Sequence, residues 1–186
     1  MIGFAMCGSF CNMETAFKEL EKLCSTEQEV LPIMSYNVYQ TDTRFGKAKD
    51  FIDRAERLCK RKVVHTLAEA EPLGPKIKLD CLCICPCTGN TLAKMSQGIC
   101  DTPVTLAAKA HLRNDRPLVL ALASNDSLSL NAENFGRMLA RRNVYFVPLR
   151  QDDAENKPRS MVCDFSCLSK TIEKAMQGIQ IQPILI

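Results

Sequence analysis

The segment from Asp80 to Leu112 has the residue types and spacing most typical of a ligand site in this chain. It begins with an apolar run, breaks at Pro86, and continues through the small polar sequence Thr88-Gly89-Asn90-Thr91 into a helical pattern. Open α/β sheets bind phosphate-bearing ligands where a strand ends in such a loop, because the first N–H groups of the following helix are unpaired and its dipole favours an anion. The segment therefore predicts an anion or nucleotide site.

Small polar loops also follow the other apolar runs, and the ends of parallel strands meet at one edge of a sheet. The Gly8-Ser9 loop lacks the lysine of a P-loop, and the chain has no G-x-G-x-x-G, so phosphoryl transfer and a dinucleotide fold are disfavoured. A Gly-Ser loop at a helix start can still hold one phosphate, as FMN requires. We expect the phosphate against Ser9 and the N–H groups around Phe10, with Asn125 at the far end of the ligand. The predicted binding residues are Gly8, Ser9, Phe10, Ser35, Thr88, Gly89, Asn90, Thr91, Ser124 and Asn125.

Eleven cysteines raise the alternative of a metal site, above all Cys81, Cys83, Cys85 and Cys87. Side chains alternate between the two faces of a strand, and four cysteines spread along one straight strand cannot converge on one ion. The Cys-x-x-Cys spacing of zinc knuckles is also absent. We therefore expect no structural metal and no disulfide, and we interpret these cysteines as small buried apolar residues.

Composition favours an ordinary globular protein. The 186 residues can bury a full core, and 46% are hydrophobic while 24% are charged. A net charge of +3 is too small and too scattered to indicate nucleic acid or a membrane surface, and no apolar run reaches membrane length. The first residues lack the basic segment of a signal peptide, and many thiols suit a reducing compartment. We expect one cytoplasmic domain over residues 1–186.

Apolar runs alternate with amphipathic patterns of three-four spacing along the whole chain. Near-continuous apolar strands between such helices indicate a sheet of five or six parallel strands covered on both faces, a three-layer αβα, Rossmann-like α/β fold. The segment from Gln151 to Pro158 is charged and is expected to be a loop. The helix from Thr102 to Leu112 is mostly apolar around its circumference, which predicts self-association. The expected strands are 2–6, 29–34, 79–85, 117–123 and 143–147, and the other expected helices are 13–24, 48–59, 131–141 and 164–177.

The order Pro86-x-Thr88-x-Asn90-Thr91-x-Ala93-Lys94, followed by Gly98-Ile99-x-Asp101, resembles the flavin-binding loop of the homo-oligomeric flavin-containing cysteine decarboxylases. In that family a Pro-x-x-x-Asn-Thr loop touches the flavin and a Gly-Ile-x-Asp turn follows. Longer pieces spread over residues 2–185 resemble one branch of this flavoprotein superfamily, the B-subunit family of dipicolinate synthases. These pieces include AEPLGPK (70–76), PCTGNTLAK (86–94), DTPVTLAAKA (101–110) and VPLRQDD (147–153).

The resemblance implies a flavoprotein fold, FMN as cofactor and a homo-oligomer. It also implies a partner, an NAD(P)-binding A subunit, with which the chain would oxidise a dihydro- or tetrahydrodipicolinate intermediate to dipicolinate in the mother cell of a sporulating bacterium. Two alternatives remain open from the residues. One is a non-catalytic binding or assembly module that kept the fold, and the other is an FMN-dependent decarboxylase-like enzyme.

The chain departs from the decarboxylases at two places. Their catalytic His has a counterpart in the region of His65, but the surrounding KVVHTLAEAEP does not match their pattern. Their Pro-Ala-Met-Asn is Leu-Ala-Ser-Asn here, so the amide of Asn125 is kept and the methionine is lost, which disfavours cysteine decarboxylation. The catalytic candidates are Asn125 and Arg44, whose guanidinium can grip a substrate carboxylate or lie free on the surface. Asp152 and Asp153 are either acid/base or metal-binding groups, or solvated loop carboxylates.

Overall fold

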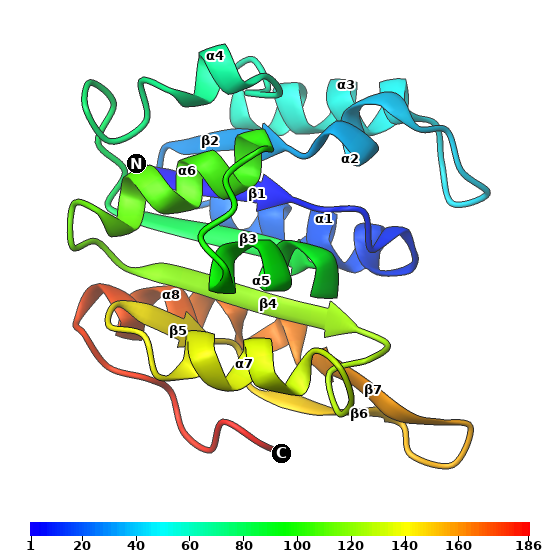
Figure 1. Cartoon of the computed structure of the whole chain (residues 1–186). Helices are drawn as coiled ribbons and strands as arrows, with labels where there is room; N and C mark the ends of the chain where they lie inside the picture. The colour runs from blue at the N-terminus through cyan, green and yellow to red at the C-terminus, as the bar shows by residue number, and fades with distance from the viewer.

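Five parallel strands form most of a seven-stranded sheet in the computed structural model, which describes residues 1–186 (Figure 1). Strand β4 pairs with β5 over its first residues and with the antiparallel hairpin β6–β7 at its end. The parallel strands run β2 (Val30–Met34), β1 (Ile2–Met6), β3 (Cys81–Cys87), β4 (Leu118–Ser124) and β5 (Val144–Phe146) across the sheet, and the hairpin adds β6 (Leu149–Asp153) and β7 (Lys157–Cys163).

Helices cover both faces of the sheet, which gives the expected three layers (Figure 1). In the view of Figure 1, α1 (Met13–Cys24) and α8 (Leu168–Met176) lie behind the sheet, and α1 packs against α3 (Ala48–Cys59) through stacked rings of Phe17 and Phe51. The helices in front are α5 (Gly89–Ser96), α6 (Pro103–Leu112) and α7 (Ala132–Leu139). The remaining short helices are α2 (Tyr36–Gln40), α4 (Leu67–Ala70) and the 3-10 turns η1 (Phe10–Asn12) and η2 (Phe165–Cys167).

Complete burial in the core explains why the parallel strands could be predicted from the sequence. Every residue of β1, β2 and β3 is buried, because helices cover both faces of the sheet, and 51 buried apolar residues form one connected cluster. The predicted three-layer αβα fold is therefore confirmed, and five of the five or six expected parallel strands are present, with an unpredicted antiparallel hairpin at one edge.

Strand β3 has the predicted length but begins and ends two residues later than predicted. It continues through Pro86 to Cys87, and the pairing with β4 shifts register between Ile84 and Cys87. Proline is tolerated at such an irregularity because no ladder bond needs its missing N–H. The next segment, Thr88–Thr91, was expected to be a loop, but it forms the N-cap and the first residues of α5. Thr88 is the N-cap of α5, and its Oγ1 accepts the N–H of Thr91 at 3.2 Å.

The charged segment 151–158 was wrongly predicted as a loop, because most of it belongs to the hairpin β6–β7.

The apolar circumference of helix α6 was the reason given for predicting self-association. Its apolar circumference is covered within the chain by α4, α5 and strands β2, β3 and β4, so this pattern alone does not require a partner chain.

The four cysteines of β3 are buried, and all eleven cysteines of the chain are free thiols. Burial raises the pKa of the Cys81, Cys85 and Cys87 thiols well above the ordinary value, so they are neutral apolar groups. No three His, Cys, Asp or Glu side chains are placed to share a metal ion. None of the helices is both long and apolar enough to cross a membrane.

Candidate functional site

A cavity of about 1100 Å³ opens at the carboxyl ends of β1, β3 and β4, where the hairpin β6–β7 extends beyond the sheet (Figure 1). Its volume is slightly above the range of roughly 300–1,000 Å³ for ligand pockets. The lining residues come from the ends of β1, β3 and β4, the hairpin β6–β7, the starts of η1, α5 and α7, and the loop before α3. They are Gly8–Asn12, Arg44, Phe45, Thr88–Asn90, Ala123–Asp126, Asn131, Asp152 and Lys157–Val162.

The start of α5 forms one side of this cavity. The N–H of Thr91 is bonded to its own N-cap, Thr88, whereas those of Gly89 and Asn90 have no acceptor. Asn90 is exposed, and its side-chain amide forms no hydrogen bond within the chain. Unpaired donors at a helix start, together with the helix dipole, attract an anion.

A second row of free donors lies at the end of β1. The N–H of Ser9 donates to the Cys7 carbonyl at 2.8 Å, and the Ser9 hydroxyl accepts from the Asn12 amide at 3.0 Å. The next two N–H groups, of Phe10 and Cys11, have no acceptor. Two helix starts therefore present unpaired N–H groups to the same cavity.

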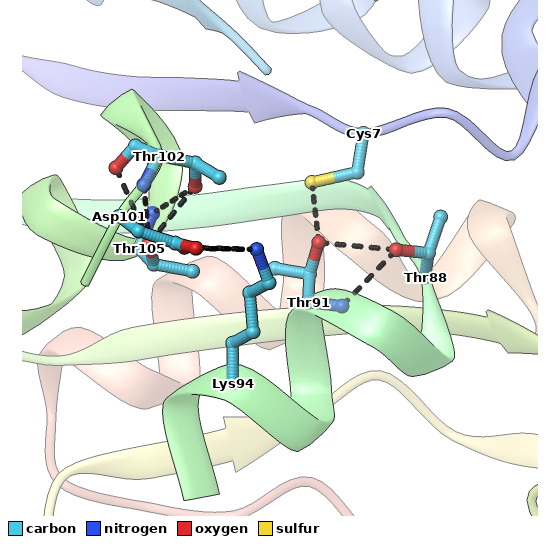
Figure 2. Close-up of polar contacts among 7 residues, drawn as sticks. All are labelled: Cys7, Thr88, Thr91, Lys94, Asp101, Thr102 and Thr105. Atoms are coloured by element: carbon cyan, nitrogen blue, oxygen red, sulfur yellow. Dashed lines mark hydrogen bonds and ion pairs between the residues drawn. The ribbon is translucent and has the colours of Figure 1, made fainter. Parts of the chain in front are cut away.

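Two predicted binding residues do not line the cavity. The Thr91 hydroxyl turns inward, donates to Cys7 Sγ at 3.2 Å and lies 3.0 Å from Thr88 Oγ1 (Figure 2). Burial raises the pKa of Cys7 to about 11, so its neutral sulfur is a weak acceptor. Ser35 lies at the start of α2, and its buried Oγ has no hydrogen-bond partner. The remaining eight predicted binding residues all line the cavity.

The turn after α5 holds that helix against α6. Lys94 reaches both carboxylate oxygens of Asp101 at 2.9 Å, and this bond holds the pKa of Asp101 below its usual range (Figure 2). Thr102 and Thr105 then form a capping box at the start of α6. The resemblance to the Gly-Ile-x-Asp turn thus marks a segment that positions α5.

The hairpin supplies a charged wall that the sequence did not predict. Lys157 is paired with Asp152 at 2.9 Å, whereas Arg159 forms no ion pair. Arg44 faces the same cavity, forms no ion pair, and lies 4.8 Å over the ring of Phe45. Two guanidinium groups are therefore free for carboxylates or phosphate.

The loop after β4 brings a carboxylate and an amide to the cavity. Asn125 is exposed with a free side-chain amide, as expected for a candidate binding or catalytic group. Asp126 accepts from Ser124 Oγ at 2.5 Å and from Asn131 Nδ2 at 2.8 and 2.7 Å. Asn131 was predicted as a helix cap, but it makes no cap bond and instead holds this carboxylate.

Gly89 is fixed by the same network. A Cβ on this residue would lie 2.5 Å from Ser124 Oγ, 2.8 Å from Asn131 Nδ2 and 2.9 Å from Asp126 Oδ1. Only glycine allows α5 to begin this close to the polar residues after β4.

His65 lies outside the cavity. Its ring stacks on Tyr39 with 3.7 Å between centroids, and its Nδ1 is 3.1 Å from Glu69 Oε2. Within this chain, its contacts are those of a side chain that holds α4 near α2.

Known proteins match this chain along its whole length. The sequence model of the family described as Flavoprotein matches residues 2–179. The B subunit of dipicolinate synthase from Bacillus subtilis (strain 168) is 43% identical over 185 residues, which cover 100% of this chain and 92% of that protein. The crystal structure of the dipicolinate synthase B subunit from Bacillus halodurans C superposes with a TM-score of 0.91 at 39% identity, covering 100% of this chain and 95% of that one.

A more distant structure shares the fold. The FMN-dependent cysteine decarboxylase SpaF superposes with a TM-score of 0.68 at 20% identity, covering 94% of this chain and 95% of that one. The full-length relatives, the parallel sheet and the strand-end cavity lead to one conclusion. The chain belongs to the Flavoprotein family.

Proposed function

We propose that this chain is the B subunit of a dipicolinate synthase, which binds FMN and a cyclic dicarboxylate in the strand-end cavity. With an NAD(P)-binding A subunit, it would oxidise a dihydro- or tetrahydrodipicolinate intermediate to dipicolinate during sporulation. The similarity to the B subunits of two dipicolinate synthases supports this assignment and the existence of a partner subunit. The observation that carries the proposal is the set of unpaired polar groups around one cavity.

The residues present fit a flavin mononucleotide. Its phosphate would bind the free N–H groups of Phe10 and Cys11, beside the Ser9 hydroxyl. The free amides of Asn90 and Asn125 can each donate and accept a hydrogen bond, as the carbonyl and N–H edge of the flavin ring requires. When bound, flavin supplies a ring that accepts a hydride or electrons.

The charged wall fits the second ligand. Arg44 and Arg159 are unpaired, and a dicarboxylate offers one carboxylate to each guanidinium. Cavity closure by a bound flavin would exclude water from these pairs and strengthen them. Because the chain has no G-x-G-x-x-G, the NAD(P) would bind the partner subunit.

We also propose that the chain works in the cytoplasm as a homo-oligomer. Three leucines around α7 are exposed, namely Leu128, Leu130 and Leu139, and Leu130 retains 87% of its accessible surface. Exposed apolar groups that lie close together in the chain favour association with another copy of it.

A titration with FMN tests the cofactor assignment. The purified chain should quench flavin fluorescence and absorb near 450 nm. Ser9→Asp places a carboxylate beside the phosphate position, and repulsion at contact in a partly dry site should weaken FMN binding by about a hundredfold or more. Ser25→Asp, at the end of α1 and outside the cavity, is the matched control and should bind FMN like the wild type.

Two outcomes would contradict the proposal. Equal FMN affinity of wild type and Ser9→Asp would mean that the phosphate lies elsewhere. A wild type that binds no FMN, alone or with the partner subunit, would favour a non-catalytic assembly module.

A further inference from the structure

The cavity contains two carboxylates, which differ in their partners. Asp152 is neutralised by Lys157 at 2.9 Å. Asp126 is half-buried, lines the same cavity, and pairs with no cation. Arg44 and Arg159 also line the cavity and are its positive side chains that form no ion pair. The cavity therefore offers two unpaired guanidinium groups and one carboxylate that pairs with no cation.

Asp126 is held in one orientation. Its side chain accepts from Ser124 and Asn131, and its main-chain carbonyl accepts the N–H groups of Ser129 at 3.0 Å and Asn131 at 3.2 Å. Asn131 is fixed in turn by Asn134, whose amide donates to Asn131 Oδ1 at 2.9 Å. A carboxylate held by such a chain of bonds is already oriented before a ligand arrives.

The carboxylate still has acceptor capacity. Each of its oxygens can accept two hydrogen bonds, and Oδ2 receives only the Asn131 donor. A second anion beside this group would be repelled, whereas an N–H or O–H donor would form a charge-assisted bond. The negative charge of Asp126 thus excludes a ligand carboxylate at this point and favours a hydrogen-bond donor.

We propose that Asp126 is a specificity-determining residue that accepts a hydrogen bond from the N–H of a protonated ring nitrogen in the ligand, while the arginines bind its carboxylates. This inference rests on the proposed function, because it takes the cyclic dicarboxylate as the ligand. It adds that the site distinguishes a ring with an N–H donor from one that has only an acceptor at that position.

Two probes of the same ring shape test the inference. At neutral pH piperidine-2,6-dicarboxylate has a protonated ring nitrogen, a cationic N–H donor between its carboxylates, and tetrahydropyran-2,6-dicarboxylate has an uncharged oxygen acceptor there. Isothermal titration of the full chain, with and without saturating FMN, should show at least about tenfold tighter binding of the piperidine by the wild type. A donor facing a fixed carboxylate gains a bond, while an ether oxygen facing it is repelled.

Asp126→Asn removes the charge and keeps the size of the side chain. It should reduce the preference to within about threefold, and its melting temperature checks that it is folded. Asp152→Asn is the matched control, because it removes the carboxylate that is already neutralised by Lys157. It should retain the wild-type preference, although freeing Lys157 can raise the affinity for both probes.

The outcomes separate the two proposals. A wild-type preference near one, or a preference that persists in Asp126→Asn, would overturn the role of Asp126. Weakened FMN binding in Asp126→Asn with an unchanged preference would assign the carboxylate to the cofactor and also overturn it. If neither probe binds the wild type in either condition, the dicarboxylate assignment itself fails. Should the variant not fold, the wild-type preference alone decides.

Discussion

At the carboxyl end of the parallel strands, several N–H groups, the amides of Asn90 and Asn125, and two arginines are left without partners, whereas at the amino end the main polar groups bond to one another. There the amino group of Met1 lies 2.5 Å from Asp80, Arg116 donates to the Leu79 carbonyl at 2.5 Å, and His111 Nε2 lies 2.8 Å from the Pro117 carbonyl. Both ends are rich in polar side chains, so composition alone does not distinguish them. What differs is whether the bonding capacity is used within the chain.

This contrast separates stability from binding. Paired groups at the amino end contribute to folding, because losing one partner leaves the other unsatisfied. Unpaired groups at the carboxyl end contribute little to folding and are available to a ligand. Changes at the amino end should therefore alter stability without altering FMN affinity, and most changes in the cavity should do the reverse.

The largest expected effect is a pH dependence at the amino end. Burial lowers the pKa of His111 from 6.5 to about 4, with Arg116 adding to the shift and the Pro117 carbonyl opposing it. Between these values the unfolded chain binds a proton that the folded chain does not, so stability rises with pH and is lost as pH falls from 6.5 towards 4. The loss should be on the order of 3 kcal/mol in urea unfolding.

His111→Gln should flatten that part of the pH profile, because glutamine does not titrate. His65→Gln, at the only other histidine, is the control and should keep the fall in stability. FMN affinity at pH 7 should be the same in both variants. A profile that is equally steep without His111 would show that other groups cause it.

The next largest effect is expected at Gly89, a cavity residue that should affect both the stability of the chain and its affinity for FMN. Gly89→Ala would push a Cβ into Ser124, Asn131 and Asp126, at distances of 2.5–2.9 Å. Such overpacking should destabilise the chain by about 1–3 kcal/mol and, by displacing the start of α5, weaken FMN binding at least about tenfold.

Gly136→Ala is the matched control. It lies in helix α7 with no atom within 4 Å of the new Cβ, so it should stabilise the chain by about 0.5–1 kcal/mol through helix propensity. Unfolding curves and FMN titrations of the two variants provide the comparison. Equal behaviour would mean that the close packing at Gly89 has no role.

The smallest expected effect is a loss of stability from a change at the amino end of the parallel strands. Arg116→Met removes the donor to the Leu79 carbonyl and should cost about 1 kcal/mol of stability, with unchanged FMN affinity. Arg113→Met, an exposed arginine without an ion pair, should change neither property. A loss of FMN binding in Arg116→Met would break the separation between the two ends.

The sequence predicted the parallel part of the sheet well, because its strands are apolar along their whole length. It failed at the hairpin β6–β7, where exposed residues such as Arg150 and Gln151 follow no apolar alternation, and Pro158 is a residue that disfavours central strands. An edge strand exposed on both faces has no hydrophobic signature, so a charged strand and a charged loop look the same in the sequence.

The candidate site was also predictable only in part. Residues that follow directly on a buried strand, such as Ser9 and Asn125, were found because the strand end marks them. Arg159 was missed because its strand was missed. Thr91 has the residue type and spacing of a ligand contact, but only the geometry of the α5 N-cap shows that its hydroxyl points to Cys7. Spacing identifies a segment, whereas the direction of a side chain depends on the turn that holds it.

The free edge of β6 bears on the tendency of the chain to aggregate. An uncovered edge strand can pair with the same edge of another molecule and nucleate fibres. Here the last residues of the chain cover its apolar start: Leu149 donates to the Ile184 carbonyl at 2.8 Å and accepts from Ile186 at 2.9 Å. Beyond that point the strand carries exposed Arg150, Gln151 and Asp152, which oppose stacking of identical edges. A short tail and a few charges thus keep the side of the molecule that borders its ligand cavity from becoming a template for self-assembly.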